Sequence, residues 1–176
     1  MTVYELGDRV PRTGKGTWVA PDATVIGDVT IGERCFIGPG ARIRGDYGSI
    51  IVGDGTAVED NVVIHARPGE RCSIGRNVTL GHGCIVHNAT LLDWAIVGMG
   101  AVVSDHAVVG EWGVVAEGAV VKNRGEVPPR RIAVGVPAKV VGEIDDAYVE
   151  QWTRFKGIYA DLASKRYPAG FREIDR

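Results

Sequence analysis

Residues 91–121, LLDWAIVGMGAVVSDHAVVGEWGVVAEGAVV, carry an aliphatic residue at every sixth position. These anchor residues are Leu91, Val97, Val103, Val109, Val115 and Val121. The same spacing runs upstream in three blocks, from Val19 to Ile43, from Val52 to Ile64 and from Ile74 to Val86. A small or thin residue follows most anchors by four positions, as Ala95 and Ala101 do. A six-residue repeat of this kind is typical of a parallel β-helix, in which short strands form the faces of a triangular prism.

The anchors also predict the size and the filling of the prism. Three hexapeptides close one coil, so the seventeen anchors predict about six coils, and a strand spacing of ~4.8 Å makes the prism roughly 28 Å tall. The 25 glycines, set against three Phe and five Tyr, agree with a core of small repeated layers. Cys35 and Cys84 fall in the small inward position, whereas Cys72, in the insertion ARPGERCS, is undecided. Three cysteines without a CxxC pair indicate neither a disulfide framework nor a zinc ribbon.

The bulk composition excludes several classes of partner. The chain has 176 residues, of which 45% are hydrophobic and 24% charged, as in a folded domain. Twenty basic and 22 acidic residues give a net charge of -2. The sequence has no block of Lys and Arg that would indicate binding to nucleic acid or to a membrane surface. The first residues lack the apolar region of a signal peptide, and no segment approaches the roughly 20 apolar residues of a membrane span. We therefore expect a cytoplasmic protein.

The repeat gives way to a helical pattern from Ile144 onward. Asp145 is a suitable N-cap, and apolar residues then recur at three- and four-residue spacing as far as Pro168. These are Val149, Trp152, Phe155, Tyr159, Leu162 and Ala163. We predict a β-helix domain over residues 1–143 that ends in the linker VPPRRIAVGVPAKVVG, an amphipathic helix over 144–168 that packs on the prism, and a tail over 169–176.

Two histidines are predicted to stack on one face of the prism. Ile64 and Val86 are three anchors apart, so His65 and His87, which follow them directly, occupy the same outward position one coil apart. His82 follows Leu80 on the adjacent face and cannot join them within one chain. A zinc site needs three protein nitrogens and an open position, which three prisms around a threefold axis would complete with a neighbour's His82. Alternatively, His82 and His87 are separate surface or interface hydrogen-bonding residues.

Charged residues gather on the same two faces. Arg44 and Asp46 lie one coil below His65, and Glu59 and Asp60 lie one coil below His82. Outward charges on a β-helix are usually only solvated, but a threefold interface would bring these four side chains close to the predicted metal site.

Five motifs in this chain resemble those of the γ-class carbonic anhydrases. They are RGD at 44–46, VEDNVVIH at 58–65, GHGCIVH at 81–87, GMGAVV at 98–103 and VGVPAKVV at 134–141. The resemblance covers nearly the whole chain. Its specific part is the three-histidine spacing together with RGD, because acyltransferases share the hexapeptide repeat.

The resemblance implies a mainly β fold, a left-handed parallel β-helix with a C-terminal α-helix, assembled as a homotrimer. It implies Zn²⁺, or Fe²⁺ or Co²⁺, bound by His65 and His87 of one subunit and His82 of the next. The implied activity is the reversible hydration of CO2 to bicarbonate, because such a site lowers the pKa of bound water toward ~7 and supplies hydroxide. Arg44 and Asp46 match a salt bridge that supports the trimer, and Glu59 and Asp60 match residues that orient water or bicarbonate. Tyr159 lies where related proteins bring a tyrosine to the pocket.

Two departures from the family pattern predict weak CO2 hydration. The family usually has Gln at the position of Glu59, and a carboxylate there can repel bicarbonate or act as a base. The family's founding member also has an acidic loop with a proton-shuttling Glu, whereas the insertion ARPGERCS is short and Glu70 is its only acid.

Three other functions stay open. The RGDYG motif and the C-terminal helix also resemble the phenylacetate-degradation and carnitine-operon relatives, some of which resemble metal-dependent acyl-CoA thioesterases. A non-catalytic trimeric metal-binding scaffold is the second. A hexapeptide acyltransferase is the third, although it would typically use one catalytic His without the triple-histidine spacing.

Overall fold

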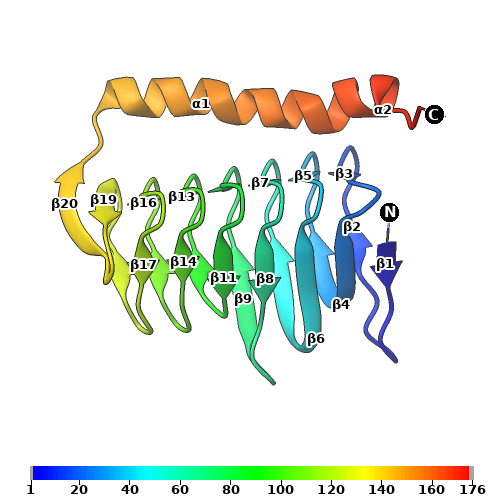
Figure 1. Cartoon of the computed structure of the whole chain (residues 1–176), viewed down its shortest axis with the longest axis horizontal. Coiled ribbons are helices and arrows are strands. Elements are labelled where there is room, and N and C mark those ends of the chain that lie inside the picture. The colour runs from blue at the N-terminus through cyan, green and yellow to red at the C-terminus, as the bar shows by residue number, and fades with distance from the viewer. Residues whose placement is uncertain (1, 175–176) are drawn as a thin grey trace.

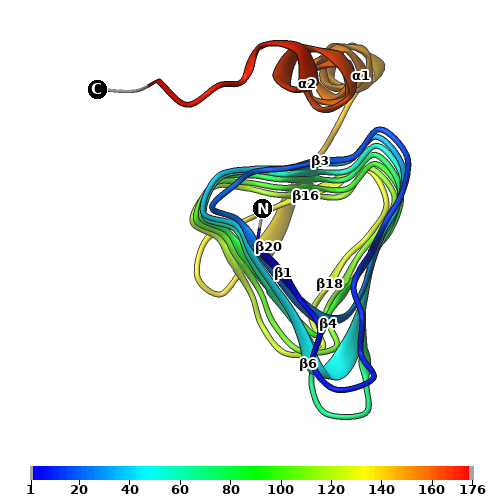
Figure 2. The ribbon, with the colours of Figure 1, turned by 90° about the vertical axis from the view of Figure 1, so that its right-hand side faces the viewer.

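Short β-strands stack into a three-sided prism, and one long helix lies along one of its faces (Figures 1 and 2). The computed structural model describes residues 2–174. Within them the strands form an 8-stranded sheet on one face and a 12-stranded sheet that bends around a corner to cover the other two. The mainly β fold with a C-terminal helix is therefore confirmed.

The 8-stranded sheet forms the helix-covered face, with one parallel strand per turn. Its strands are β3 (Trp18–Val19), β5 (Phe36–Ile37), β7 (Ala57–Val58), β10 (Thr79–Leu80), β13 (Ile96–Val97), β16 (Val114–Val115) and β19 (Arg131–Val134). At the end of the stack, β20 (Lys139–Glu143) pairs with β19 in antiparallel orientation.

The other sheet forms the remaining two faces. The first, which we call the histidine face, contains β1 (Thr2–Tyr4), β8 (Val63–His65), β11 (Ile85–His87), β14 (Val102–Val103) and β17 (Val120–Val121). The third face contains β2 (Arg12–Thr13), β9 (Arg71–Ile74), β12 (Thr90–Leu91), β15 (Val108–Val109) and β18 (Glu126–Val127). The longer strands β4 (Thr24–Ile31) and β6 (Arg42–Val52) round the corner between them and belong to both.

The coils wind to the left. Seen from the N-terminal end, the chain passes from the helix-covered face to the histidine face and then to the third face, anticlockwise as it recedes (Figure 2). This is the hand that the family resemblance implied, and the opposite of ordinary parallel crossovers.

The prism has about seven turns, so the prediction of about six was too low. Val127 and Ala133 continue the six-residue spacing beyond Val121, and β18 and β19 pair with β15 and β16. At the other end, β1 and β2 pair with β4 before the first predicted anchor. The stretch predicted as a linker therefore builds the end of the stack, and its Pro128 and Pro129 lie between strands, where no ladder hydrogen bond is lost.

The anchors and the small residues between them form one continuous core. Cys35 and Cys84 point inward as predicted, and Cys72 joins them opposite Ile50 of β6. All three thiols are free and buried, and desolvation raises the pKa of Cys35 and Cys72 to about 11 and that of Cys84 to about 12. The cysteines are therefore unreactive filling of the core.

The C-terminal helix comprises α1 (Asp146–Asp161), the π-helical segment η1 (Leu162–Arg166) and α2 (Tyr167–Gly170). Asp145 caps its start, as predicted, by accepting a hydrogen bond from the Tyr148 N–H at 2.8 Å. The helical path continues past Pro168, the predicted end. Within η1, the Tyr167 N–H reaches back to Leu162 O, and this wider turn precedes the proline that would disrupt a regular α-turn. None of the helices within residues 2–174 is long and apolar enough to span a bilayer.

Candidate metal centre

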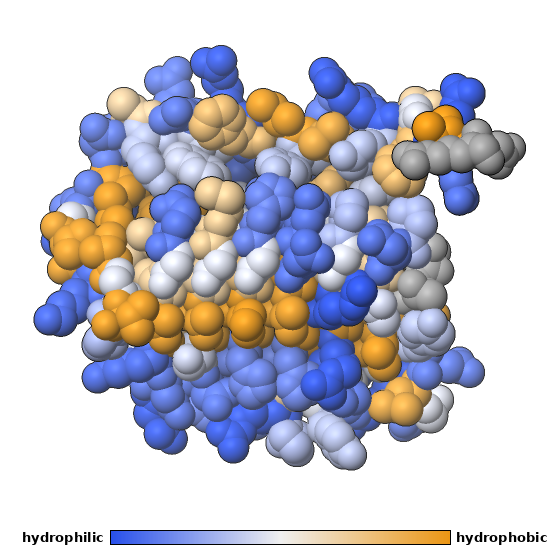
Figure 3. Space-filling model, in the orientation of Figure 1, coloured by the Kyte–Doolittle hydropathy of each residue, from blue (hydrophilic) through white to orange (hydrophobic). Residues whose placement is uncertain are grey.

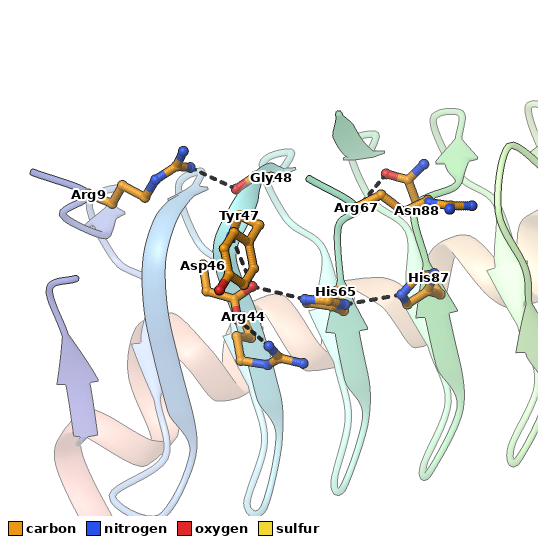
Figure 4. A network of polar contacts seen from close by, with 9 residues as sticks. All are labelled: Arg9, Arg44, Asp46, Tyr47, Gly48, His65, Arg67, His87 and Asn88. Atoms are coloured by element: carbon orange, nitrogen blue, oxygen red, sulfur yellow. Dashed lines mark hydrogen bonds and ion pairs between the residues drawn. The ribbon is translucent and has the colours of Figure 1, made fainter. Parts of the chain in front are cut away.

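His65 and His87 lie side by side at the ends of β8 and β11 (Figure 4). The strands pair in the predicted register, with His87 opposite His65 and Arg44 opposite His65 on the other side. The anchors Ile64 and Val86 point inward, so the next residue in each strand points out of the prism. His65 Nδ1 and His87 Nε2 face one another at 3.1 Å.

Asp46 holds the outer nitrogen of His65. It lies where β6 rounds the corner, and its Oδ1 is 2.9 Å from His65 Nε2 (Figure 4). The Arg44 guanidinium pairs with the other oxygen, and the Tyr47 N–H donates to Oδ1 at 3.0 Å. Desolvation would raise the pKa of Asp46, but the hydrogen bonds from His65 and Arg44 outweigh it and lower that pKa. Asp46 is therefore an ionised acceptor at neutral pH.

Asp105 holds the outer nitrogen of His87 in the same manner. Its Oδ1 lies 2.5 Å from His87 Nδ1, and its Oδ2 lies 3.1 Å from Arg67 Nη1. Desolvation again opposes the shift, but the hydrogen bond and charge of His87, followed by the charge of Arg67, lower the pKa of this carboxyl. Neither Asp105 nor Arg67 was a predicted site residue. One coil onward from Val86 is Val103, because the step from Val86 to Leu91 is one residue short, so the repeat places Ser104 over His87 and counting did not single out Asp105.

The two carboxylates decide what the inner nitrogens can bind. An ionised carboxylate only accepts hydrogen bonds, so a neutral His65 carries its proton on Nε2 and a neutral His87 on Nδ1. The lone pairs of His65 Nδ1 and His87 Nε2 then face each other at 3.1 Å, which is unfavourable unless a proton or a metal ion lies between them. Two nitrogens bound to one tetrahedral zinc stand roughly 3.3 Å apart. The pair therefore fits a metal ion.

His82 lies at a different corner of the prism, between the helix-covered face and the histidine face. Gly83 after it adopts a φ of 69°, and a Cβ on Gly81 before it would meet Met99 N at 2.9 Å, so both glycines are needed for the tight turn. Glu59 Oε2 lies 3.1 Å from His82 Nε2 and accepts a hydrogen bond from its backbone N–H, and Asp60 Oδ2 lies 3.5 Å from Nδ1. The His82 side chain is 46% exposed.

A single chain brings together only part of the predicted trio. Among residues 2–174, no group of three or more His, Cys, Asp or Glu side chains is arranged to hold a metal ion. The structure joins His65, His87, Asp46 and Arg44 in one cluster and His82, Glu59 and Asp60 in another. His106 belongs to neither, since its Nδ1 lies 3.4 Å from Glu70 on the surface.

Helix α1 covers the second cluster with two polar side chains. Burial, followed by the charge and a hydrogen bond of Glu59, raises the pKa of Tyr159, whose ring packs edge-on against Phe36 at 5.3 Å. Lys156 is the only buried residue of α1, and its Nζ donates to Thr79 Oγ1 at 2.8 Å. Burial lowers the pKa of this amine to about 7, partly opposed by the charge of Glu59. The sequence pattern did not single out Lys156.

A groove of about 490 Å³ extends from the second cluster along α1. Glu59 and His82 lie at one end, and its walls are mostly apolar residues of β13, β16 and α1, including Ile96, Val114 and Trp152. Glu117 adds a second carboxylate to the lining.

The chain is similar to known hexapeptide-repeat proteins. The family model "Bacterial transferase hexapeptide (six repeats)" matches residues 11–45, and "Hexapeptide repeat of succinyl-transferase" matches residues 71–105. The crystal structure of a hexapeptide transferase family protein from Anaplasma phagocytophilum superimposes with a TM-score of 0.88 at 33% identity, covering 92% of this chain and 96% of that one.

Three curated relatives narrow the family. Gamma carbonic anhydrase 2 of Arabidopsis thaliana mitochondria is 36% identical over 92% of this chain, which spans only 60% of that protein's length. A probable carbonic anhydrase of Methanocaldococcus jannaschii is 44% identical, covering 77% of this chain and 86% of the relative. The carnitine operon protein CaiE of Escherichia coli is 34% identical, covering 96% and 86%. With this coverage, the chain belongs to the γ-carbonic anhydrase-like family of hexapeptide-repeat proteins.

Proposed function

We propose that the protein is a homotrimeric metalloenzyme that hydrates CO2 reversibly to bicarbonate, with zinc bound by His65 and His87 of one subunit and His82 of the next. The observation that carries the proposal is the pair of inner imidazole nitrogens, 3.1 Å apart and both turned into acceptors by Asp46 and Asp105. A third nitrogen has to come from elsewhere. His82 is exposed and lies beside two carboxylates that can orient it, whereas His106 lies beside Glu70 on the surface.

An apolar stripe beside the histidine pair supports a subunit interface there. On the histidine face, Val63, Ile85, Val102 and Val120 stack in register and point outward. Val63 and Ile85 are 38% and 40% exposed, and Figure 3 has a continuous hydrophobic band across these strands. An exposed apolar band with a polar rim is typical of a protein contact. A second copy seated on this stripe would bring its own corner residues toward His65 and His87.

The residues of the two clusters have distinct tasks in this proposal. Zinc at such a site lowers the pKa of water toward ~7 and so supplies hydroxide for attack on CO2. Asp46 and Asp105 keep two imidazoles oriented, and Arg44 and Arg67 keep the carboxylates in place. His82 must exchange one carboxylate contact for the metal, and the 3.5 Å approach of Asp60 is the weaker of the two. Glu59, 6% exposed, stays beside the reacting atoms, where it orients water and accepts a proton.

Metal loading is expected to decide whether the protein is active. The purified protein should be a trimer with about one zinc per chain, and chelation should abolish CO2 hydration until zinc is restored. Metal analysis and stopped-flow CO2 hydration measure this directly, and His106→Asn, which tolerates the positive φ of this position, is the matched control that should keep its metal. A protein that takes up no metal on reconstitution would refute the proposal.

The groove favours one second candidate, a metal-dependent acyl-CoA thioesterase. Its volume of about 490 Å³ far exceeds what CO2 needs, and its apolar walls suit an acyl or aryl group whose thioester carbonyl lies near Glu59 and His82. A trimeric metal-binding scaffold is the remaining alternative, and it would bind zinc without turning over either substrate.

Filling the groove separates the two enzymatic candidates. If the protein hydrolyses acyl-CoA thioesters, Ala116→Phe should lower kcat/KM for aryl and medium-chain substrates by roughly tenfold or more, because the added ring occupies the groove. Ala116→Ser is the matched control, and CO2 hydration on the same zinc-loaded samples should stay unchanged. Thioester hydrolysis no faster than that of the metal-free protein would rule this candidate out.

A further inference from the structure

We propose that Asp105, held by Arg67, is a positioning residue that fixes His87 in the tautomer able to bind the metal. The inference rests on the proposed zinc site and extends it to two residues outside the family motifs. Its starting point is the 2.5 Å contact between Asp105 Oδ1 and His87 Nδ1.

The fold delivers Asp105 to His87 through a corner turn. Strand β14 ends at Val103, and the turn that follows is tight because His106 adopts a φ of 58° and its N–H donates to Asn88 O at 2.8 Å. This backbone contact stacks the turn of Asp105 directly on the turn that follows His87. The carboxylate therefore reaches the imidazole from the next coil, and its side chain is 21% exposed.

Arg67 stops the carboxylate from rotating. The two oxygens of Asp105 have different partners, since Oδ1 faces His87 and Oδ2 faces Arg67 Nη1 at 3.1 Å. The backbone of Arg67 is held in turn, because its N–H donates to Asn88 Oδ1 at 3.1 Å and Asn88 is 3% exposed. Asn88 in turn donates to Glu70 Oε2 at 2.6 Å. The short insertion after β8 thus has a function of its own, which is to present Arg67 to Asp105.

The contacts of His87 match those of His65. Arg44, Asp46 and His65 form one Arg–Asp–His series, and Arg67, Asp105 and His87 form a second on the opposite side. Each carboxylate binds the outer imidazole nitrogen and leaves the inner one with its lone pair. Metal-binding histidines generally donate their second N–H to such an acceptor, and loss of that acceptor typically weakens metal binding 10–100-fold.

Asp105→Asn tests the inference, because an amide keeps the shape of the carboxylate but can donate to Nδ1. We expect the His87 proton to move in part to Nε2 in the metal-free protein, observed by ¹⁵N NMR of the imidazole. Zinc affinity, measured by competition with a chromophoric chelator, should fall roughly 10–100-fold with an unchanged thermal unfolding midpoint. Arg67→Gln should lower the zinc affinity by a smaller factor. Asp105→Glu, which keeps a carboxylate, should retain part of the affinity that Asp105→Asn loses.

Asp93→Asn is the matched control. Asp93 is another arginine-paired carboxylate at a corner of the prism, 2.8 Å from Arg76 Nη2, but no histidine contacts it. Its variant should bind zinc like the wild type. Unchanged zinc affinity and an unchanged His87 tautomer in Asp105→Asn would overturn the inference. A wild-type protein that binds no zinc would refute the proposed function instead, and the tautomer of His87 would still report on Asp105.

Discussion

Mixing a His65→Ala variant with a His82→Ala variant is expected to restore zinc binding to about one quarter of the sites, although each variant alone binds none. In a shared site, the first subunit supplies His65 and His87 and its neighbour supplies His82. After random exchange, half of the first positions hold a chain with intact His65, and half of their neighbours hold a chain with intact His82. Zinc content per chain, measured after dialysis, gives the result directly.

A second mixture provides the control. His65→Ala and His87→Ala both damage the pair that one subunit supplies, so no combination of these chains contains a complete pair, and their mixture should bind no zinc. Subunit exchange is verified in both mixtures by mass spectrometry of trimers with distinguishable tags. Equal recovery in the two mixtures, or none in the first after proven exchange, would contradict the shared site.

Lys156→Met is expected to stabilise the protein at pH 7 by about 3 kcal/mol. Lys156 is 4% exposed, and burial lowers the pKa of its amine to about 7 from an ordinary value near 10.5. Burying a positive charge costs free energy that a methionine of similar length does not, even after the hydrogen bond to Thr79 is lost. The rings of Trp112 and Trp152, with centroids 6.0 and 5.7 Å from Nζ, already form an apolar setting for the thioether.

The stabilisation should depend on pH in a defined direction. The folded pKa of Lys156 lies below the unfolded one, so between pH 7 and 10.5 the unfolded chain binds more protons. Below pH 7 the wild type bears the full free-energy cost of burying the charged amine, and its stability rises as pH increases toward 10.5. The difference in stability between Lys156→Met and the wild type should therefore shrink over that range. Urea unfolding at pH 6.5, 8 and 9.5 measures this. Lys165→Met, at an exposed lysine of η1 in the same C-terminal helix, should leave the unfolding midpoint unchanged. A Lys156→Met protein less stable than wild type at pH 7 would contradict the argument.

The β-helix and its histidine stack were predictable because the repeat acts as a ruler. Once Ile64 and Val86 are assigned to one face, the pairing of His65 with His87 follows from counting, and it is confirmed. The number of turns was underestimated because Ala133 is a weak anchor and the prolines before it resemble a linker. Asp105 could not be reached by the same counting, because the five-residue step between Val86 and Leu91 places Ser104 over His87 and leaves Asp105 one residue further along the turn.

Hydropathy did not predict which face of the C-terminal helix packs against the prism. The predicted apolar stripe includes Phe155, which is 43% exposed, while the neighbouring Lys156 is buried. The rotation of a helix on a sheet depends on which side chains it meets, and here Thr79 and Glu59 interrupt an otherwise apolar face. Neighbouring residues on a helix point about 100° apart, so tertiary contacts decide whether Phe155 or Lys156 points toward the sheet, and the sequence pattern does not encode those contacts.

The helix extends along the whole stack, and this changes how the molecule should unfold. In most solenoids each repeat contacts only its neighbours, so the ends fray independently of the middle. Here the start of α1 packs against Ile96, Val114 and Ile144, while the far end of the helix packs Ala163 and Tyr167 against Trp18 and Phe36 of the first turns (Figure 1). Turns at opposite ends of the stack thus pack against the same helix, so that opening either end disturbs contacts at the other. By contacting both ends of the stack, the helix couples the turns, and we expect the β-helix to unfold as a single cooperative unit.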